Sequence, residues 1–183
     1  MENIKSFQSQ KVIKFLAIIF LGSILLTASA KFKIPFYPVP MTMQTFVVLF
    51  FGLAFGYKIG LSIVGLYLIE GILGLPVFSN SPERGVGLIY FTGPTMGYLI
   101  GFLFAVFLSG YLDLKKNIFI IFFKLLLSVS VIYILGLIWL GILIGSDKPI
   151  LELGAIPFLP AELLKILILT LLTKKIIKLR SFI

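Results

Sequence analysis

Long, unbroken apolar runs separated by short polar segments make up most of this chain. Within the runs, apolar residues follow one another without the alternation of a membrane-barrel strand, so the pattern favours helices. A helix needs roughly 20 apolar residues to cross the hydrocarbon core of a bilayer. The pattern predicts an all-α integral membrane protein, a bundle of six transmembrane helices. The expected spans cover residues 11–30, 42–55, 57–75, 92–112, 116–144 and 157–177.

Composition narrows the class further. Hydrophobic residues make up 60% of the 183 positions and charged residues 13%, too little polar surface for a soluble domain of this size. The sequence contains no Cys and no His, which excludes disulfides, zinc sites with thiolate or imidazole ligands, and imidazole acid–base catalysis. Because no polar linker is long enough to separate two units, we expect residues 1–183 to form a single transmembrane domain.

The net charge of +9 orients the helices and does not indicate nucleic-acid binding. With the N-terminus inside, only Lys31, Lys33, Arg84 and Lys148 face outwards, while Lys124 and Lys165 lie within spans. The other cations face the cytoplasm: Lys5, Lys11, Lys14, Lys58, Lys115, Lys116, Lys174, Lys175, Lys178 and Arg180. This asymmetry follows the positive-inside rule and predicts that both termini are cytoplasmic.

The first apolar segment also has the form of a secretory signal. Lys11 and Lys14 precede the apolar run 15–26, and Ala28-Ser29-Ala30 has the small residues of a cleavage site. Cleavage would leave five spans and place the new N-terminus outside. Retention gives six spans and a consistent charge distribution, and we therefore expect the segment to be retained.

The loops expected on the outer side are longer than those inside and richer in turn residues. They cover residues 31–41, 76–91 and 145–156. Long, proline-rich loops on one side only are candidates to shape or close a site there. We expect this role for the first two loops, and the third is equally well explained as an ordinary connector.

Glu162 and Lys165 are the most informative charges. They follow Pro157-Phe158-Leu159-Pro160, and proline is favoured in the first turn of a helix. Glu162 thus lies where the helix dipole favours a negative charge, but Lys165 lies at the wrong end for a cation. Three residues apart, the two side chains share a face. They could form a ligand site facing a polar cavity or a structural ion pair, and both interpretations remain open.

Small residues recur every fourth position along the fourth expected span, at Gly93, Gly97, Gly101, Ala105 and Ser109. In lipid, such a face allows another helix to approach closely. The partner helix could belong to this chain or to another membrane protein, and the same question applies to Ser23 and Thr27 in the first span.

Four segments carry a family resemblance, in order along the chain. They are Pro38-Val39-Pro40-Met41-Thr42-Met43-Gln44-Thr45, Gly74-Leu75-Pro76-Val77-Phe78, Gly93-Pro94-Thr95-Met96-Gly97-Tyr98 with Gly101-Phe102, and Pro157-Phe158-Leu159-Pro160 with Lys165. In these segments the chain resembles the BioY family, the biotin-binding S component of energy-coupling-factor (ECF) vitamin transporters. It departs from the family at Glu162, where the family usually has Asp, and in the first span, where Ser23 and Thr27 replace an A-x-x-x-A pattern used to contact a membrane partner.

The resemblance implies a subunit that captures biotin outside and releases it inside. Its partners would be a transmembrane coupling protein and two ATPases, in a bacterial or archaeal plasma membrane. It implies no cofactor, since ATP would be used only by the partner subunits. The expected substrate-binding residues, whose polar and aromatic groups suit biotin, are Lys165, Glu162, Asn80, Gln44, Tyr98, Phe78 and Tyr90.

Other classes of function fit the sequence less well. A stand-alone carrier needs a continuous polar path, but the inner halves of the expected spans are almost wholly apolar. A membrane enzyme needs a cluster of acids or histidines; the seven acidic residues are scattered, and no phosphate-binding G-x-x-x-x-G-K-[ST] loop is present. A scaffold leaves Lys165 and the proline-rich loops without a role. An S component for a different vitamin remains an alternative.

Overall fold

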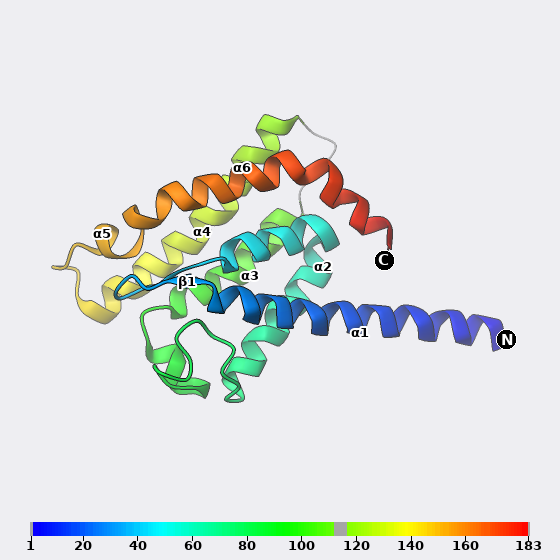
Figure 1. Ribbon diagram of the computed structural model, residues 1–183, viewed down its shortest axis with the longest axis horizontal. Coiled ribbons are helices and arrows are strands. Elements are labelled where there is room, and N and C mark those ends of the chain that lie inside the picture. Colours follow the sequence, from blue (N-terminus) through cyan, green and yellow to red (C-terminus); the bar gives the residue numbers. More distant parts are fainter. Residues whose placement is uncertain (1, 112–116, 183) are drawn as a thin grey trace.

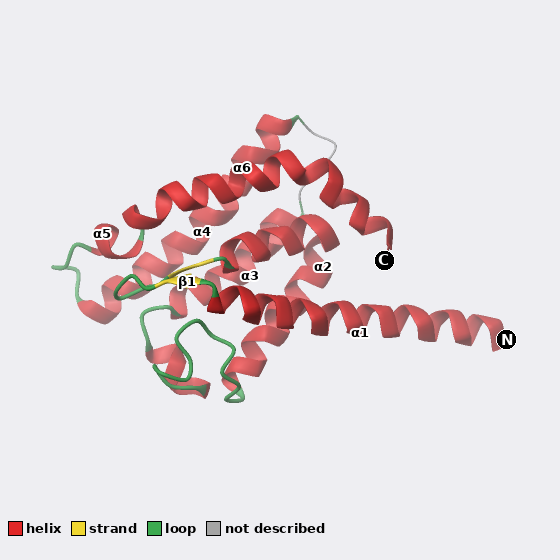
Figure 2. Cartoon of the chain, viewed as in Figure 1, coloured by secondary structure: helices red, strands yellow, loops and turns green. Residues whose placement is uncertain are grey.

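The computed structural model describes residues 2–111 and 117–182, with side chains for residues 10–111 and 117–180. Figure 1 shows a helical bundle. The start of α1 and the end of the last helical segment lie at the same end of the bundle. The helices are α1 (Glu2–Lys31), α2 (Gln44–Ile72), α3 (Met96–Gly110), α4 (Ile118–Ile144), α5 (Ile150–Gly154) and α6 (Leu159–Ile176). Two short strands, β1 (Lys33–Ile34) and β2 (Met41–Thr42), and three 3₁₀ segments, η1 (Gly87–Thr92), η2 (Ile156–Phe158) and η3 (Ile177–Phe182), complete the described chain. Figure 2 shows how little of it is strand.

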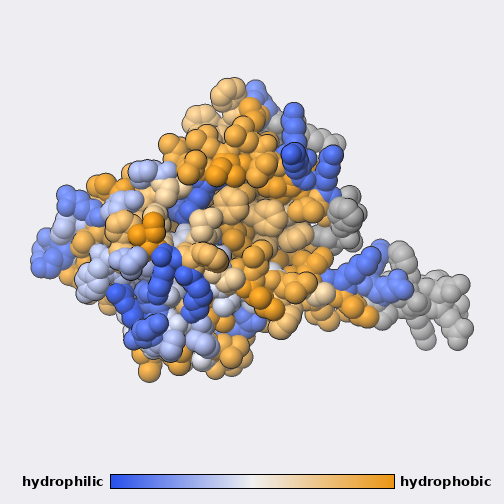
Figure 3. All heavy atoms as spheres, in the orientation of Figure 1, coloured by the Kyte–Doolittle hydropathy of each residue, from blue (hydrophilic) through white to orange (hydrophobic). Residues whose placement is uncertain are grey.

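The predicted helical membrane class is confirmed. Within the described residues, four helical stretches are long and apolar enough to cross a membrane, while α3 is apolar but shorter. These four stretches cover Gln10–Lys31, Gln44–Ile72, Ile118–Ile144 and Ile150–Arg180. Figure 3 shows hydrophobic residues over the middle of the molecule and hydrophilic residues gathered towards its two ends. This distribution suits a bundle surrounded by lipid.

A single glycine divides α2 where the sequence predicts a connector between two spans. Gly56 has φ 78° and ψ 172° inside an otherwise helical stretch, and α2 changes direction along its length in Figure 1. A positive φ is accessible to glycine without steric penalty. The predicted spans 42–55 and 57–75 are therefore two helical segments joined at one residue instead of by a separate loop.

Helix α3 lies between α2 and α4 and packs closely against both. A Cβ atom added at Gly101 would lie 2.7 Å from the Cα atom of Ile132 in α4, and one added at Gly97 would overlap the Leu135 carbonyl oxygen. Farther along the same stripe, Ala105 and Ser109 are fully buried. The small-residue stripe of α3 is thus occupied inside this chain. Gly93, just before the helix, accepts a hydrogen bond of 2.8 Å from the Trp139 indole.

Helix α1 packs on the second half of α2. Ser23 is buried and donates a hydrogen bond to the Glu70 carboxylate, while Thr27 is only half-buried. Ser23 is therefore engaged within this chain. Glu70 therefore has a hydrogen-bond partner in α1.

Candidate functional site

Basic side chains tie together the first two of the loops that the sequence predicts on the outer side. Lys31 donates to the Phe78 and Ser81 carbonyl oxygens at 2.8 and 2.9 Å, and Lys33 donates to the Ser79 carbonyl at 2.7 Å. In the opposite direction, Arg84 of the second loop donates to the Pro38 carbonyl of the first at 2.8 Å. Its guanidinium also lies over the ring of Tyr37, 5.5 Å from the centroid.

The β1–β2 pairing, with Lys33 opposite Thr42, folds the first loop back on itself. Because the cations hold backbone carbonyls, the two loops form one continuous cover. We call this cover, residues 31–43 and 73–95, the outer cap.

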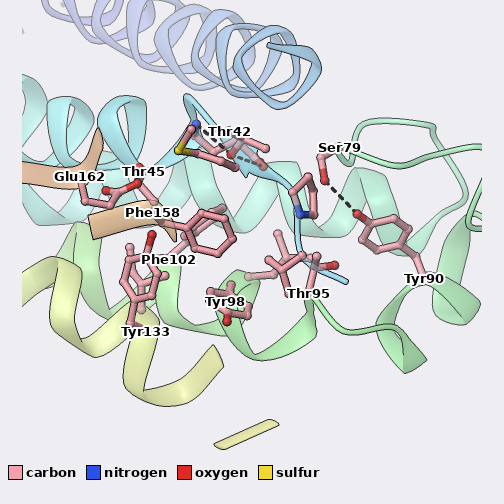
Figure 4. A pocket seen from close by; sticks show the side chains of 16 residues that line it. Thr42, Thr45, Ser79, Tyr90, Thr95, Tyr98, Phe102, Tyr133, Phe158 and Glu162 are labelled. Atoms are coloured by element: carbon pink, nitrogen blue, oxygen red, sulfur yellow. Dashed lines mark hydrogen bonds between the residues drawn. The ribbon is translucent and has the colours of Figure 1, made fainter. Parts of the chain in front are cut away.

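A small cavity lies directly beneath the outer cap. Its volume is about 50 Å³, room for only a few water molecules at roughly 10–15 Å³ each. Figure 4 shows side chains converging on it from the cap and from α3, α4 and α6. The lining residues are Val39, Pro40, Met41, Thr42, Gln44, Thr45, Ser79, Tyr90, Thr95, Tyr98, Leu99, Phe102, Ile132, Tyr133, Phe158 and Glu162.

Glu162 and Lys165 form a buried ion pair at one side of this cavity. The pair is 2.7 Å long between Lys165 Nζ and Glu162 Oε1, and the two residues are only 6% and 4% exposed. Proline near the start of α6 places Glu162 in its first turn. Thr45 Oγ1 donates to the same carboxylate oxygen at 2.9 Å. The charges of the pair offset each other in a region where a single buried charge would be costly.

Lys165 uses its full donor capacity within the protein. An ammonium group has three N–H donors, and Lys165 Nζ contacts the Thr42 carbonyl oxygen at 2.6 Å, Thr45 Oγ1 at 3.0 Å and Glu162 Oε1 at 2.7 Å. In this conformation Lys165 is engaged in the ion pair with Glu162, and a role for Lys165 in contacting a ligand stays a prediction. The residue fixes the start of α2 to α6 and lies outside the cavity lining.

Glu162, by contrast, has an unused acceptor. Its Oε2 atom is buried and has no hydrogen-bond partner within the described residues, although Glu162 lines the cavity. Figure 4 shows the Tyr133 hydroxyl of α4 pointing toward this carboxylate. A buried carboxylate oxygen without a donor is costly and is an acceptor for the N–H groups of a ligand.

Gln44 is held in place at the start of α2. Its Nε2 donates to the Tyr67 hydroxyl at 2.7 Å, and the hydroxyl donates in turn to the Val77 carbonyl at 3.3 Å. Gln44 is 4% exposed and lines the cavity. The chain from Gln44 through Tyr67 therefore connects the cavity to the segment that carries Phe78.

The second loop brings three predicted residues together, but only one reaches the cavity. Tyr90 lines the cavity, and its hydroxyl lies 3.2 Å from Ser79 Oγ. Phe78 stacks behind Tyr90, with ring centroids 4.6 Å apart and an interplanar angle of 27°. Asn80 is directed to the cap, where its Oδ1 accepts a 2.9 Å hydrogen bond from Lys33. Phe78 and Asn80 thus support the cap and the wall and do not line the cavity.

Tyr98 joins the cavity to the packing of α3 on α4. Its hydroxyl donates to the Gly154 carbonyl at 2.8 Å, and its ring lies edge-on to Tyr133, with the centroids 5.9 Å apart. Tyr98 and Tyr133 form an aromatic wall with Phe158, which contacts Tyr133 at 6.3 Å between ring centroids. Aromatic walls with a few oriented polar groups are typical of small-molecule sites.

Among the predicted site residues, Gln44, Tyr90, Tyr98 and Glu162 line the cavity, while Lys165, Asn80 and Phe78 lie behind or above it. Tyr133, Phe158 and Thr45 also line the cavity and were not predicted as site residues from the sequence. Thr45 and Thr42 gave a usable signal, since they are polar residues at the start of an apolar run. Tyr133 gave a weaker one, as a hydroxyl in the middle of an apolar helix.

Comparison with known proteins gives concordant results. A family model described as the BioY family matches residues 2–182. The chain is similar to the "Probable biotin transporter BioY" of Pyrococcus horikoshii, with 34% identity over 77% of this chain and 82% of that protein. It is also similar to the "Biotin transporter BioY" of Thermotoga maritima, with 33% identity over 85% of this chain and 90% of the other.

A solved structure shares the fold as well as the sequence. It is a crystal structure of "the S-component for biotin from an ECF-type ABC transporter", with a TM-score of 0.76 and 26% identity. The similarity covers 92% of this chain and 93% of that one. Together with the apolar helices, these relatives identify a multi-pass membrane protein.

Proposed function

Because the chain belongs to the BioY family, we propose that it is the substrate-binding membrane subunit for biotin uptake. It captures biotin from the outside and releases it inside. Two of its relatives are named as biotin transporters, and a third is named as a biotin S component. The chain therefore works as a transport protein and not as an enzyme.

The observation that carries this proposal is the buried Glu162 carboxylate beside the cavity beneath the outer cap, whose Oε2 has no hydrogen-bond partner among the described residues. Biotin offers two ureido N–H donors, a ureido carbonyl, a carboxylate and an apolar body. Glu162 could accept from a ureido N–H, while the tyrosine and phenylalanine wall could pack on the apolar body. The cavity is too small to hold biotin as it stands, so binding requires the cap and the wall to move apart.

The proposed topology has six spans with both termini in the cytoplasm of a bacterial or archaeal cell. The break at Gly56 supports counting α2 as two crossings, because the chain changes direction there. Figure 1 shows the start of α1 and the end of α6 at the same end of the bundle, which suits an even number of crossings. The whole chain would act as one transmembrane domain in the plasma membrane.

The proposed partners are a transmembrane coupling protein and two ATPases. The related crystal structure is that of an S component from an ECF-type ABC transporter, which supports this arrangement. The chain would need no cofactor of its own, and ATP would act only through the partner subunits.

Equilibrium binding of biotin to the purified, detergent-solubilised protein tests the proposal, with thiamine as the control vitamin. We expect saturable, selective binding without ATP. Glu162→Gln should weaken it about tenfold or more, because a hydrogen bond to a charged group is lost. Glu152→Gln, the same change at an exposed position on α5, should bind as the original protein does.

Failure to bind by a folded sample would remove biotin as the substrate. Other vitamins would then be screened in the same assay, and selective binding of one of them would assign a different substrate to the same subunit class. Equal affinity of Glu162→Gln and Glu152→Gln would leave biotin in place but remove Glu162 from the site.

A further inference from the structure

A second hollow opens at the opposite end of the molecule, where α2 breaks and where α3 and α6 end. Its volume is about 570 Å³, and it opens at the surface of the protein. Two cations, Lys58 and Arg180, line it together with the aromatic residues Phe15, Tyr57 and Tyr111. None of these residues contributes to the site beneath the outer cap.

Arg180 is fixed in this hollow by the backbone of two helices. Its Nε donates to the Leu53 carbonyl at 2.9 Å, and its Nη2 donates to the Gly52 and Gly110 carbonyls at 3.0 and 3.2 Å. These carbonyls belong to the last turn of the first α2 segment and the end of α3, where helix dipoles favour a cation. Within the described residues, no acceptor lies on Nη1, so one side of the guanidinium fork is available for a ligand.

Lys58 supplies a second donor beside the first turn of the helical segment that follows Gly56. Its side chain is exposed and forms no hydrogen bond or ion pair in the described part of the chain. The first N–H groups of a helix lack intrahelical acceptors and favour anions. An anion in this hollow would therefore meet an ammonium, a guanidinium edge and the start of a helix.

The walls of the hollow suit an amphipathic ligand more than a free ion. Tyr57 packs edge-on against Tyr111, with ring centroids 6.0 Å apart, and Phe15 and Ile59 add apolar surface. Figure 3 shows hydrophilic side chains at this same end, on α1 and around the end of α6, beside the apolar middle of the molecule. Tyrosines at such a boundary are typical of the membrane–water interface.

We propose that this hollow binds the phosphate headgroup of an anionic phospholipid. Lys58 and the Nη1 group of Arg180 contact the phosphate, while the acyl chains of the lipid lie along the apolar surface beside Phe15. Basic pockets at the cytoplasmic side of membrane helices are suited to such headgroups. The inference goes beyond the proposed function and does not depend on which vitamin the cavity takes.

Native mass spectrometry tests it directly. The detergent-purified protein is offered equal amounts of dioleoyl-phosphatidylglycerol and dioleoyl-phosphatidylcholine, and the retained lipid is counted. We expect preferential retention of one phosphatidylglycerol, reduced about fivefold in Lys58→Gln. Lys148→Gln, which removes the same charge from an exposed outer position, should retain lipid as the original protein does.

Arg180→Lys is the second variant, since it keeps the charge but removes the planar fork. It should lose both lipid selectivity and thermal stability, and if it fails to fold, Lys58→Gln still decides the question. Equal retention of the two lipids, or displacement of phosphatidylglycerol by millimolar inorganic phosphate, would overturn the proposal. Binding of a co-purifying membrane protein at this hollow in place of lipid would overturn the proposal as well. Biotin binding, measured on the same samples, should be unchanged in Lys58→Gln.

Discussion

The cluster around Glu162 and Lys165 and the interface between α3 and α4 are both buried, and they hold their members by different means. At the interface, the backbones of α3 and α4 are in contact because Gly101 has no Cβ atom, and a Cβ atom there would have no room beside Ile132. In the cluster, position depends on charge and on hydrogen bonds, and Glu162 Oε2 has no hydrogen-bond partner in the described part of the chain. Close packing of this kind allows only one arrangement of the two helices. The cluster, in contrast, retains an acceptor without a donor next to a cavity, among the described residues. The comparison indicates which region can accommodate a ligand and which must stay fixed.

Lys165→Met breaks the cluster and should have the largest effect. It leaves the Glu162 carboxylate buried without its cation, and loss of one partner of a buried pair typically costs about 3–5 kcal/mol. Thermal unfolding in detergent measures this loss. The double variant Glu162→Gln, Lys165→Met should recover much of the stability, because no charge is left buried. A double variant as unstable as the single one would show that the methylene stem of Lys165 matters more than its charge.

Gly101→Ala tests the interface and should rank second. The added methyl group would lie 2.7 Å from Ile132 Cα, and overpacking of this kind costs about 1–3 kcal/mol. Gly65→Ala is the matched control, since a Cβ atom there meets nothing within 4 Å. The control should be neutral or slightly stabilising, because alanine favours helix. Equal unfolding temperatures for the two variants would contradict the close packing of α3 on α4.

Tyr98→Phe probes the residue that belongs to both regions. The variant loses the hydrogen bond from the hydroxyl to the Gly154 carbonyl and should cost about 1 kcal/mol. The ring still packs against Gly136, so the helices should keep their arrangement. Biotin affinity and unfolding temperature, measured side by side, separate the two roles. A fall in affinity without any loss of stability would place the hydroxyl in direct contact with ligand.

Arg84→Gln addresses the cover over the cluster and should have the smallest effect on stability. Arg84 is exposed, so water offsets much of its hydrogen bond to Pro38, and we expect a loss of roughly 0–1 kcal/mol. Its effect should appear in kinetics as faster dissociation of biotin, because the two loops of the outer cap separate more easily. Stopped-flow dissociation measures this rate. Lys148→Gln is the control, and an equal rate for both variants would show that the Arg84 contact does not limit release.

Much of the fold could be predicted from the sequence because the long helices follow predominantly apolar runs bounded by Gly, Pro or charge. The expected span 157–177 corresponds to α6 at Leu159–Ile176, and 116–144 to α4 at Ile118–Ile144. Of the expected span 92–112, α3 covers Met96–Gly110 and follows η1, while residue 112 lies outside the described residues. There the residues around Gly93 form a 3₁₀ segment and a turn, which apolar composition alone does not separate from a helix.

The site was less predictable because its contacts join distant residues. Lys165 donates to Thr42, 123 positions away in the chain. No local sequence pattern shows that one N–H group of Lys165 is used in this contact and is not left for a ligand. Phe78 and Tyr90 are both aromatic residues of one loop, yet one stacks behind the other. The sequence does not show which of the two stacked rings faces the cavity, because that depends on how the loop packs.

The hydrogen bond between Ser23 and Glu70 bears on how the chain is processed during export. Signal peptidase would have to cut after Ala30, but Ala30 is fully buried and α1 remains helical to Lys31. Removing the preceding residues would take away Ser23 and leave the half-buried Glu70 carboxylate without this donor. In this structure, the segment that has the composition of a leader thus supplies a buried hydroxyl partner for Glu70.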